Sequence, residues 1–276
     1  MSALVLTREG ETLLFECGEG TQRQMMRYGV GFALNDVFFT HFHGDHYLGI
    51  IGLVRTLGLQ GRTEPMRLVG PRAGGAARLL GQALALGVER PAFPVEIVEV
   101  EPDQVLAREG YELRVFGVEH GAGAVGYALV ESQRLGKFDP ARASELGVPE
   151  GPLWGRLQRG QTVQLDDGRE VTPETIVGPP RPGRKVVYSG DTRPCAATVE
   201  AARGADLLVH EATFGEEEKD RAKETAHATA REAAEVAKRA GARRLALTHL
   251  SARYSRDAAV LLDEARAVFP ETVVAK

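Results

Sequence analysis

Four side chains that commonly bind metals fall within six consecutive positions: His41, His43, Asp45 and His46, with Gly44 among them. In an extended segment the two leading histidines point to the same side, and a turn at Gly44 can bring the next two ligands to a neighbouring point. Imidazole and carboxylate suit Zn²⁺, and a catalytic zinc needs further protein ligands plus an open position for water. The cluster therefore predicts two adjacent half-sites whose remaining ligands come from elsewhere in the chain.

Three more candidate ligands each follow an apolar segment that is typical of a strand. His120 follows YELRVFGVE, Asp191 follows KVVYSG, and His249 follows RRLALT. In layered α/β folds, sites are assembled at the carboxyl ends of strands. Any one of these histidines alone would more often be an ordinary core or surface residue. Together with the six-residue cluster, their shared position at strand ends favours a metal site.

The elements that position these residues alternate between strands and helices, which indicates an α/β fold with mixed sheets. Residues 36–40 form an apolar strand that runs straight into the histidine cluster, and a helical stretch follows over 47–57. Earlier, residues 3–6 and 12–16 pair as a hairpin around Glu9-Gly10, and a helix candidate covers 19–28. Near the C-terminal end, Thr229 and Glu232 have the spacing of a capping box, so a helix begins at Thr229 and closes at Gly241.

Composition sets limits on function. With 276 residues, 43% of them hydrophobic, the chain can form one large domain or two modest ones. A net charge of −4 argues against binding nucleic acid through overall basicity, so such a partner needs a local basic patch. Two cysteines, Cys17 and Cys195, are too few for a disulfide framework. We find neither a membrane span nor a signal peptide, and we expect a cytoplasmic protein with no membrane partner.

The HFHGDH run resembles the H-x-H-x-D-H signature of metallo-β-lactamase-fold hydrolases. That resemblance implies an α/β, four-layer αββα sandwich that binds two Zn²⁺ ions per chain. It implies that His41, His43 and His120 hold one ion. It also implies that Asp45, His46 and His249 hold the other, while Asp191 bridges both.

Narrower segments are similar to the ribonuclease Z family, in the family's order over nearly the whole chain: GEGTQRQ, THFHGDHYLGIIGL, SGDTRPC, HEATF, His227-Ala228-Thr229 and THLSARY. The resemblance implies a homodimeric endoribonuclease that removes the 3′ trailer of precursor tRNA and leaves a 3′-hydroxyl on the tRNA. Family members usually begin with a further strand and loop, so we expect the first N-terminal strand to be missing here. A non-catalytic tRNA-binding protein is therefore one alternative.

The chemistry of phosphodiester hydrolysis indicates roles for further residues. Asp45 is expected to orient or deprotonate a metal-bound water while remaining a ligand. His227 is the candidate general acid, because it lies in a loop just before a helix and its ordinary pKa is in the useful range. Glu211, at the end of ADLLVHE, is expected to orient that imidazole; the alternative is a buried carboxylate held by backbone amides. In GEGTQRQ, we expect Thr21 and Arg23 to contact tRNA; the alternative is that Gln22 and Arg23 lie on a solvated helix face.

The interval 132–184 is far longer than an ordinary connection between strands. It contains helix-like ARASEL, turn-rich GVPEGPLWGRL and hairpin-like QTVQLDDGREV with Asp167-Gly168 at the bend, so we expect a small inserted subdomain within a single domain of residues 1–276. It resembles the flexible, substrate-binding arm of bacterial ribonuclease Z, and Gly151, Pro152 and Arg156 are its candidate tRNA contacts. Its aromatic residues either stack on RNA or fill a small core of their own. A metallo-β-lactamase-fold phosphodiesterase or lactonase acting on small molecules is the other alternative, and it would not need this insert.

Overall fold

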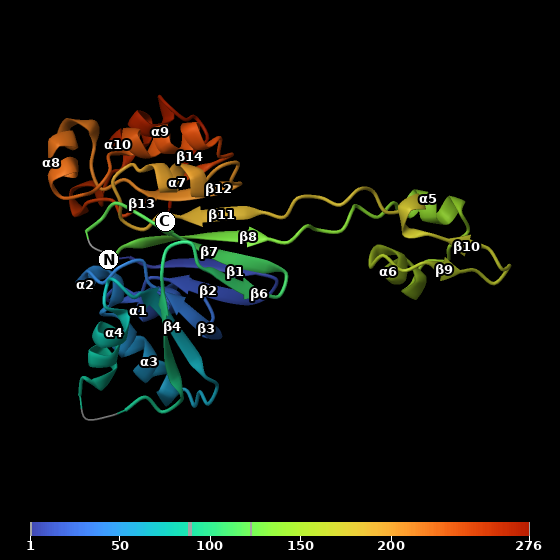
Figure 1. Ribbon diagram of the computed structural model, residues 1–276, viewed down its shortest axis with the longest axis horizontal. Helices are drawn as coiled ribbons and strands as arrows, with labels where there is room; N and C mark the ends of the chain where they lie inside the picture. The colour runs from blue at the N-terminus through green and yellow to red at the C-terminus, as the bar shows by residue number, and fades with distance from the viewer. Residues whose placement is uncertain (1, 88–89, 122, 276) are drawn as a thin grey trace. The chain divides into compact units, whose positions relative to one another are not determined.

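The computed structural model describes residues 2–87, 90–121 and 123–275 (Figure 1). The chain divides into two compact units. The larger, here called the body, comprises Met1–Ala107, Leu113–Leu129 and Lys185–Lys276. The smaller, here called the insert unit, comprises Arg108–Glu112 and Val130–Arg184. Within the described ranges, no helix combines the length and the apolar character needed to cross a membrane.

The first sheet of the body has the strand order β1-β2-β3-β4-β5. Its strands are β1 (Leu4–Arg8), β2 (Glu11–Phe15), β3 (Leu34–Phe38), β4 (Met66–Pro71) and β5 (Val95–Val100). The predicted hairpin is confirmed, because β1 and β2 pair antiparallel with Arg8 opposite Glu11. The strands β2 to β5 run parallel, so their carboxyl ends meet at one edge.

Four helices accompany this sheet: α1 (Thr21–Arg27), α2 (Gly44–Tyr47), α3 (Ile50–Leu59) and α4 (Ala76–Ala85). The single helix expected over 47–57 is instead divided into α2 and α3, and α2 already begins at Gly44. Apolar residues of α3 and α4, such as Leu53 and Leu80, are fully buried with Leu14 and Val37 of the sheet in one cluster. This burial fixes the helices on the outer face of the first sheet (Figure 1).

The second sheet has the order β14-β13-β12-β11-β8-β7-β6. Its strands are β6 (Val105–Arg108), β7 (Tyr111–Gly117), β8 (Val125–Glu131), β11 (Lys185–Tyr188), β12 (Leu207–Glu211), β13 (Leu245–Thr248) and β14 (Thr272–Val274). The last four strands are parallel. The accompanying helices are α7 (Ala196–Ala201), α8 (Lys219–Glu224), α9 (Ala230–Ala240) and α10 (Ala259–Arg266), and short 3₁₀ turns lie at Glu216–Glu218 and Ala252–Tyr254.

The two sheets face each other across an aromatic core. Phe15 of β2 stacks on Phe38 of β3 at 5.2 Å, and Tyr127 of β8 meets both rings. The Tyr127 hydroxyl also donates to Phe39 O at 2.8 Å, which ties β8 to the segment that leads into the histidine cluster. With α3 and α4 outside one sheet and α7, α9 and α10 outside the other (Figure 1), the four-layer αββα sandwich is confirmed.

Helix α9 begins as the sequence predicts. The Thr229 hydroxyl accepts from Glu232 N at 3.2 Å, and the Glu232 carboxylate accepts from Thr229 N at 3.0 Å, which completes the capping box. Gly241 closes the helix at φ 61°, a conformation that suits glycine. The preceding helix α8 has no counterpart in the predictions, because KDRAKE lacks an apolar face of its own.

The insert unit has a small core of its own. It contains α5 (Pro140–Glu145), α6 (Pro152–Gln158), a 3₁₀ turn at Pro173–Thr175, and the antiparallel pair β9 (Val163–Gln164) and β10 (Glu170–Val171). The segment expected to be turn-rich therefore holds a helix, because Pro152 occupies the first helical position, where its fixed φ is favourable. Trp154 packs on Phe138 at 5.3 Å and donates Nε1–H to Val148 O. These aromatics thus contribute to the insert unit's own core.

Candidate metal centre and catalytic site

The first three histidine rings converge on one point. β3 ends at Phe38, so the segment that follows presents His41 and His43 beyond the sheet edge. His41 Nε2 lies 3.1 Å from His43 Nδ1, and His43 Nδ1 lies 3.2 Å from His120 Nε2. We call these three residues the first half-site.

A second group lies beside it and comprises Asp45, His46 and His249, here called the second half-site. His46 and His249 face each other with their Nε2 atoms 3.3 Å apart. Asp45 Oδ2 is 3.4 Å from His249 Nε2 and 3.5 Å from His46 Nε2. His249 has φ 53°, a left-handed conformation that is costly for a non-glycine residue and is often found at functional sites.

Asp191 lies between the half-sites. Its Oδ2 is 3.3 Å from both His46 Nε2 and His249 Nε2, and 3.8 Å and 3.9 Å from His41 Nε2 and His120 Nε2. The carboxylate is almost fully buried, and its Oδ1 has no hydrogen-bond partner among the described residues. One carboxylate oxygen is therefore within reach of ligands from both groups.

The hydrogen bonds behind the rings fix which nitrogen faces the centre. His120 Nδ1–H donates to Ala226 O at 2.8 Å, so its Nε2 carries the lone pair. His249 Nδ1 contacts the Thr213 hydroxyl at 2.9 Å, and His41 Nδ1 contacts the Thr40 hydroxyl at 3.0 Å. Bare nitrogens that face one another cannot hydrogen-bond, but they suit a cation held between them, and such outer contacts are typical of metal-ligating histidines. The residues present thus fit a divalent metal at each half-site.

Burial and charge set the protonation of these ligands. Burial, together with the charge of His46, lowers the pKa of His41 to about 2, so His41 is neutral as a ligand must be. Burial opposes protonation of His46, yet its contacts with Asp191 and Glu16 raise its pKa to about 10, so in the absence of metal His46 carries a proton that a cation at Nε2 would have to displace. Burial also opposes ionisation of Asp191, but the neighbouring His46 and His249 hold its pKa well below the ordinary range.

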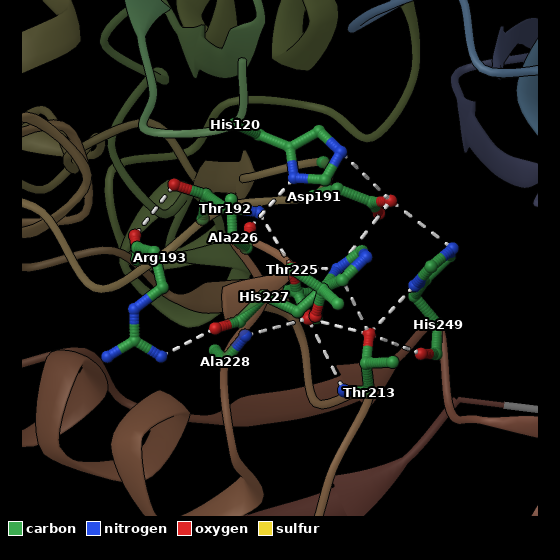
Figure 2. A network of polar contacts seen from close by, with 12 residues as sticks. His120, Asp191, Thr192, Arg193, Thr213, Thr225, Ala226, His227, Ala228 and His249 are labelled. Atoms are coloured by element: carbon green, nitrogen blue, oxygen red, sulfur yellow. Dashed lines mark hydrogen bonds and ion pairs between the residues drawn. The ribbon is translucent and has the colours of Figure 1, made fainter. Parts of the chain in front are cut away.

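His227 lies next to this centre (Figure 2) and forms a pair with Glu211. Glu211 Oε1 accepts from His227 Nδ1 at 2.8 Å. Both Glu211 oxygens also accept backbone N–H groups, Oε1 from Thr192 at 2.7 Å and Oε2 from Ala228 at 3.0 Å. The Glu211 carboxylate thus contacts the His227 imidazole and is also held by backbone amides, so the two arrangements considered from the sequence occur together. Burial disfavours the charged imidazole, but the Glu211 carboxylate outweighs that effect and raises the pKa of His227.

The loop that carries His227 is held from the other side by Arg193 (Figure 2). The Arg193 guanidinium donates to His227 O at 2.5 Å and makes a bidentate pair with the Glu232 carboxylate at 2.8 and 2.6 Å. Its backbone N–H donates to Glu119 O, next to His120. Arg193 thus connects the segments that follow β7 and β11 with the start of α9.

Several residues of this network were not predicted, namely Glu16, Thr40, Arg193 and Thr213. Glu16 directly follows β2, and the candidate ligands likewise follow their strands, so its position was a usable signal. The other three act through hydroxyl or guanidinium contacts with residues far away in the sequence, such as Arg193 with Glu232. Nothing in their local sequence indicates those contacts.

The five candidate tRNA contacts lie in two places. In α1, Thr21 is only 4% exposed and its hydroxyl donates to Gly18 O at 2.6 Å, so this side chain is engaged within the protein, whereas Arg23 is exposed. Gly151, Pro152 and Arg156 are exposed at and within α6 of the insert unit. Of the α1 pair, only Arg23 presents its side chain to solvent.

Comparisons with known proteins agree on one family. The model for the metallo-beta-lactamase superfamily matches residues 2–138, and the model for a beta-lactamase superfamily domain matches 159–250. The chain is 60% identical to the ribonuclease Z of Gemmatimonas aurantiaca, over 100% of this chain and 88% of that protein. It is 59% identical to the ribonuclease Z of Myxococcus xanthus, over 96% and 86%. Among solved structures, human tRNase Z, short form, matches with a TM-score of 0.69 and 27% identity, over 100% of this chain and 89% of that chain.

Proposed function

Because the chain belongs to the ribonuclease Z family of the metallo-β-lactamase superfamily, we propose that it is a metal-dependent endoribonuclease that removes the 3′ trailer of precursor tRNA. The observation that carries the proposal is the convergence of two half-sites on Asp191 beside the Glu211–His227 pair. This arrangement provides cation ligands and a proton donor within one site, and phosphodiester hydrolysis requires both.

We assign one Zn²⁺ to His41, His43 and His120, a second to Asp45, His46 and His249, and the bridging role to Asp191. When bound, such a pair of ions lowers the pKa of a shared water toward about 7 and neutralises the phosphate oxygens. Zinc is our choice because the ligand set is dominated by imidazole with few carboxylates. The half-sites contain no thiolate, since both cysteines lie elsewhere in the core.

Asp45 is the residue assigned to the attacking water. Its side chain is 44% exposed, whereas Asp191 is 2% exposed, so Asp45 is the carboxylate that solvent reaches. The carboxylate of Asp45 orients this water and accepts its proton while Oδ2 stays close to His46 and His249.

His227 is assigned to the leaving group. Its Nδ1–H is committed to Glu211, so Nε2 is the nitrogen that gives a proton to the departing 3′ oxygen of the tRNA. The buried Glu211 carboxylate orients the ring and stabilises its charged form, which is the form that can donate. Cleavage then leaves a 3′-hydroxyl on the tRNA and a phosphate on the trailer.

Substrate binding is assigned to the insert 132–184 and to exposed Arg23. Arg156 and its neighbour Arg159 are exposed at the end of α6, where phosphate groups can reach them. Because Trp154 and Phe138 are used in the insert unit's own core, binding there rests on charge rather than on base stacking. We further propose that the protein is a homodimer in the cytoplasm.

The test is incubation of the protein with a precursor tRNA that carries a 3′ trailer, with and without a chelator, followed by mapping of the cut. We expect chelator-sensitive cleavage at the tRNA's 3′ end that leaves a 3′-hydroxyl. Hydrolysis of small phosphodiesters or lactones without any cut in the tRNA would favour a small-molecule hydrolase. Tight tRNA binding without cleavage of any substrate would favour a non-catalytic binding protein.

A further inference from the structure

The turn that carries His227 has an unfavourable backbone conformation at Ala226. Helix α8 ends at Glu224, and the turn is closed where His227 N donates to Ala222 O at 2.8 Å. Ala226 has φ 57°, a left-handed conformation that crowds the Cβ atom of any residue other than glycine. Such a conformation persists only where the surrounding structure holds it. The contacts around this turn therefore decide where the His227 ring lies.

Two consecutive carbonyl groups of the turn are held by different side chains (Figure 2). Ala226 O accepts from Nδ1–H of His120, a candidate ligand of the first half-site, at 2.8 Å. His227 O accepts from the Arg193 guanidinium at 2.5 Å. The His227 ring makes a third contact, with Glu211 Oε1 at 2.8 Å. The direction of the ring thus depends on the backbone contact with Arg193 as well as on Glu211.

Arg193 is itself fixed at the start of α9. Its two terminal nitrogens make a bidentate pair with the Glu232 carboxylate at 2.8 and 2.6 Å. Burial opposes ionisation of Glu232, but the hydrogen bonds from Arg193 and from Thr229 N outweigh that effect and lower its pKa. Because Glu232 also belongs to the capping box of α9, the guanidinium joins the His227 turn to the first turn of that helix.

The surroundings of Arg193 argue against a role as an RNA contact. Its side chain is only 20% exposed, and both terminal nitrogens are used within the protein. Its backbone N–H donates to Glu119 O at 2.9 Å, which fixes the segment on the side of His120 as well. Among the described residues, the guanidinium makes no hydrogen bond to a candidate metal ligand. Its direct contact with the catalytic machinery is therefore the His227 carbonyl.

We propose that Arg193 is a positioning residue for the proton donor, which holds His227 O so that the His227 ring stays aimed at the departing 3′ oxygen. The inference rests on the role assigned to His227 under the proposed function. A displacement of about 1 Å in a reacting group can lower a rate by roughly 10²-fold. The effect of Arg193 should therefore appear only where the leaving group needs a proton.

Three variants test this dependence. Arg193→Ala removes the guanidinium, and we expect it to slow cleavage of precursor tRNA by about 10²-fold. Arg193→Lys keeps the charge, but an ammonium cannot reproduce the planar fork that meets both Glu232 oxygens, so it should recover only part of the rate. In the double variant Arg193→Ala/His227→Ala the ring is already gone. Loss of Arg193 should then add little to the effect of His227→Ala, because residues that act as a unit are not additive.

The control is Arg67→Ala, which removes another bidentate arginine from a buried carboxylate, that of Asp36 in the first sheet. The full-length, zinc-loaded variants are compared under single-turnover conditions on precursor tRNA and on a nitrophenyl phosphodiester, whose nitrophenolate departs without a proton donor. Thermal unfolding identifies a temperature at which every variant is folded. Elemental analysis gives the zinc content, which should match that of the wild type because all candidate ligands remain.

Support requires that Arg193→Ala slows cleavage of the tRNA far more than hydrolysis of the nitrophenyl ester, while Arg67→Ala shows no such difference. Equal losses on the two substrates overturn the inference, and so does a full additional loss in the double variant or a loss of zinc. If Arg193→Ala does not fold, Arg193→Lys decides by the same comparison. A wild-type protein that cuts no precursor tRNA contradicts the proposed function itself, so the two failures are distinguishable.

Discussion

His227 is the residue whose replacement separates proton donation from metal binding and from RNA binding. In His227→Ala the Glu211 carboxylate keeps its hydrogen bonds from Thr192 N and Ala228 N, so the local backbone remains in place. The half-sites keep all their candidate ligands. We therefore expect Zn²⁺ content and tRNA affinity close to those of the wild type, with turnover lowered by about 10²- to 10⁴-fold, the usual contribution of general acid catalysis.

Replacement of Glu211 should also lower turnover, though less than replacement of His227 does, and the contact between the two residues sets the size of this effect. The 2.8 Å hydrogen bond between His227 Nδ1 and a fully buried carboxylate is charge-assisted, and such a bond contributes about 2 kcal/mol, which corresponds to roughly 30-fold in rate. Glu211→Gln should therefore lower turnover less than His227→Ala does. It should also destabilise the fold, because both Glu211 oxygens accept N–H groups and the amide NH₂ must face one of them.

The assay compares two substrates under single-turnover conditions. Cleavage of precursor tRNA requires protonation of an alkoxide leaving group, whereas the nitrophenolate of a nitrophenyl phosphodiester departs without that help. The loss in His227→Ala should be large for the tRNA and small for the nitrophenyl ester. Thr225→Ala is the matched control, since it changes the same loop at an exposed residue whose hydroxyl donates to Arg221 O within α8 rather than to a site residue.

Equal losses on both substrates would refute the assignment of His227 as the proton donor, and His227 would then be a residue that positions the site. A loss of Zn²⁺ in His227→Ala would refute it in a different way, since the ring would then act through the metal centre.

Three further predictions concern Asp191, the insert and Arg193. Asp191→Ala should lose both zinc ions and nearly all activity, because its Oδ2 is near ligands of both half-sites; elemental analysis that finds two ions in this variant would contradict the bridging role. Replacement of residues 132–184 by a short Gly-Ser linker should abolish tight, salt-sensitive tRNA binding but not hydrolysis of small phosphodiesters; unchanged affinity in a folded protein would eliminate the insert as the binding element. Arg193→Ala should lower stability by about 3 kcal/mol, because it leaves the buried Glu232 carboxylate without its bidentate partner, and turnover should fall too; calorimetry showing no change in Tm would contradict this.

The convergence of the candidate ligands could be predicted from the sequence because their residue types are rare and their positions are regular. His41, His43 and His46 are close in the chain, and His120, Asp191 and His249 each follow a strand, so topology alone brings them to one edge. The four-layer fold could be predicted for a related reason, since the apolar segments alternate in a way that allows few arrangements. Motifs similar to one family supplied the finer assignments.

The residues behind the ligands could not be predicted, because their roles arise from tertiary contacts. Glu16 approaches Thr40 across 24 positions and Arg193 approaches Glu232 across 39, and neither distance leaves a local pattern. The helix α6 was missed because Gly and Pro in its sequence indicate turns, although Pro is favourable at a helix start. The sequence predicts a tRNA contact at Thr21, but its hydroxyl donates to Gly18 O because the side chain is buried at the start of α1.

The most direct test of the account is the rate of precursor tRNA cleavage measured while metal-free protein is titrated with Zn²⁺, with bound metal determined in the same samples. We expect no cleavage in the metal-free protein and a rate that rises until about two ions are bound per chain, as a two-metal site requires. Cleavage at the tRNA's 3′ end by metal-free protein at the rate of the loaded protein would contradict it.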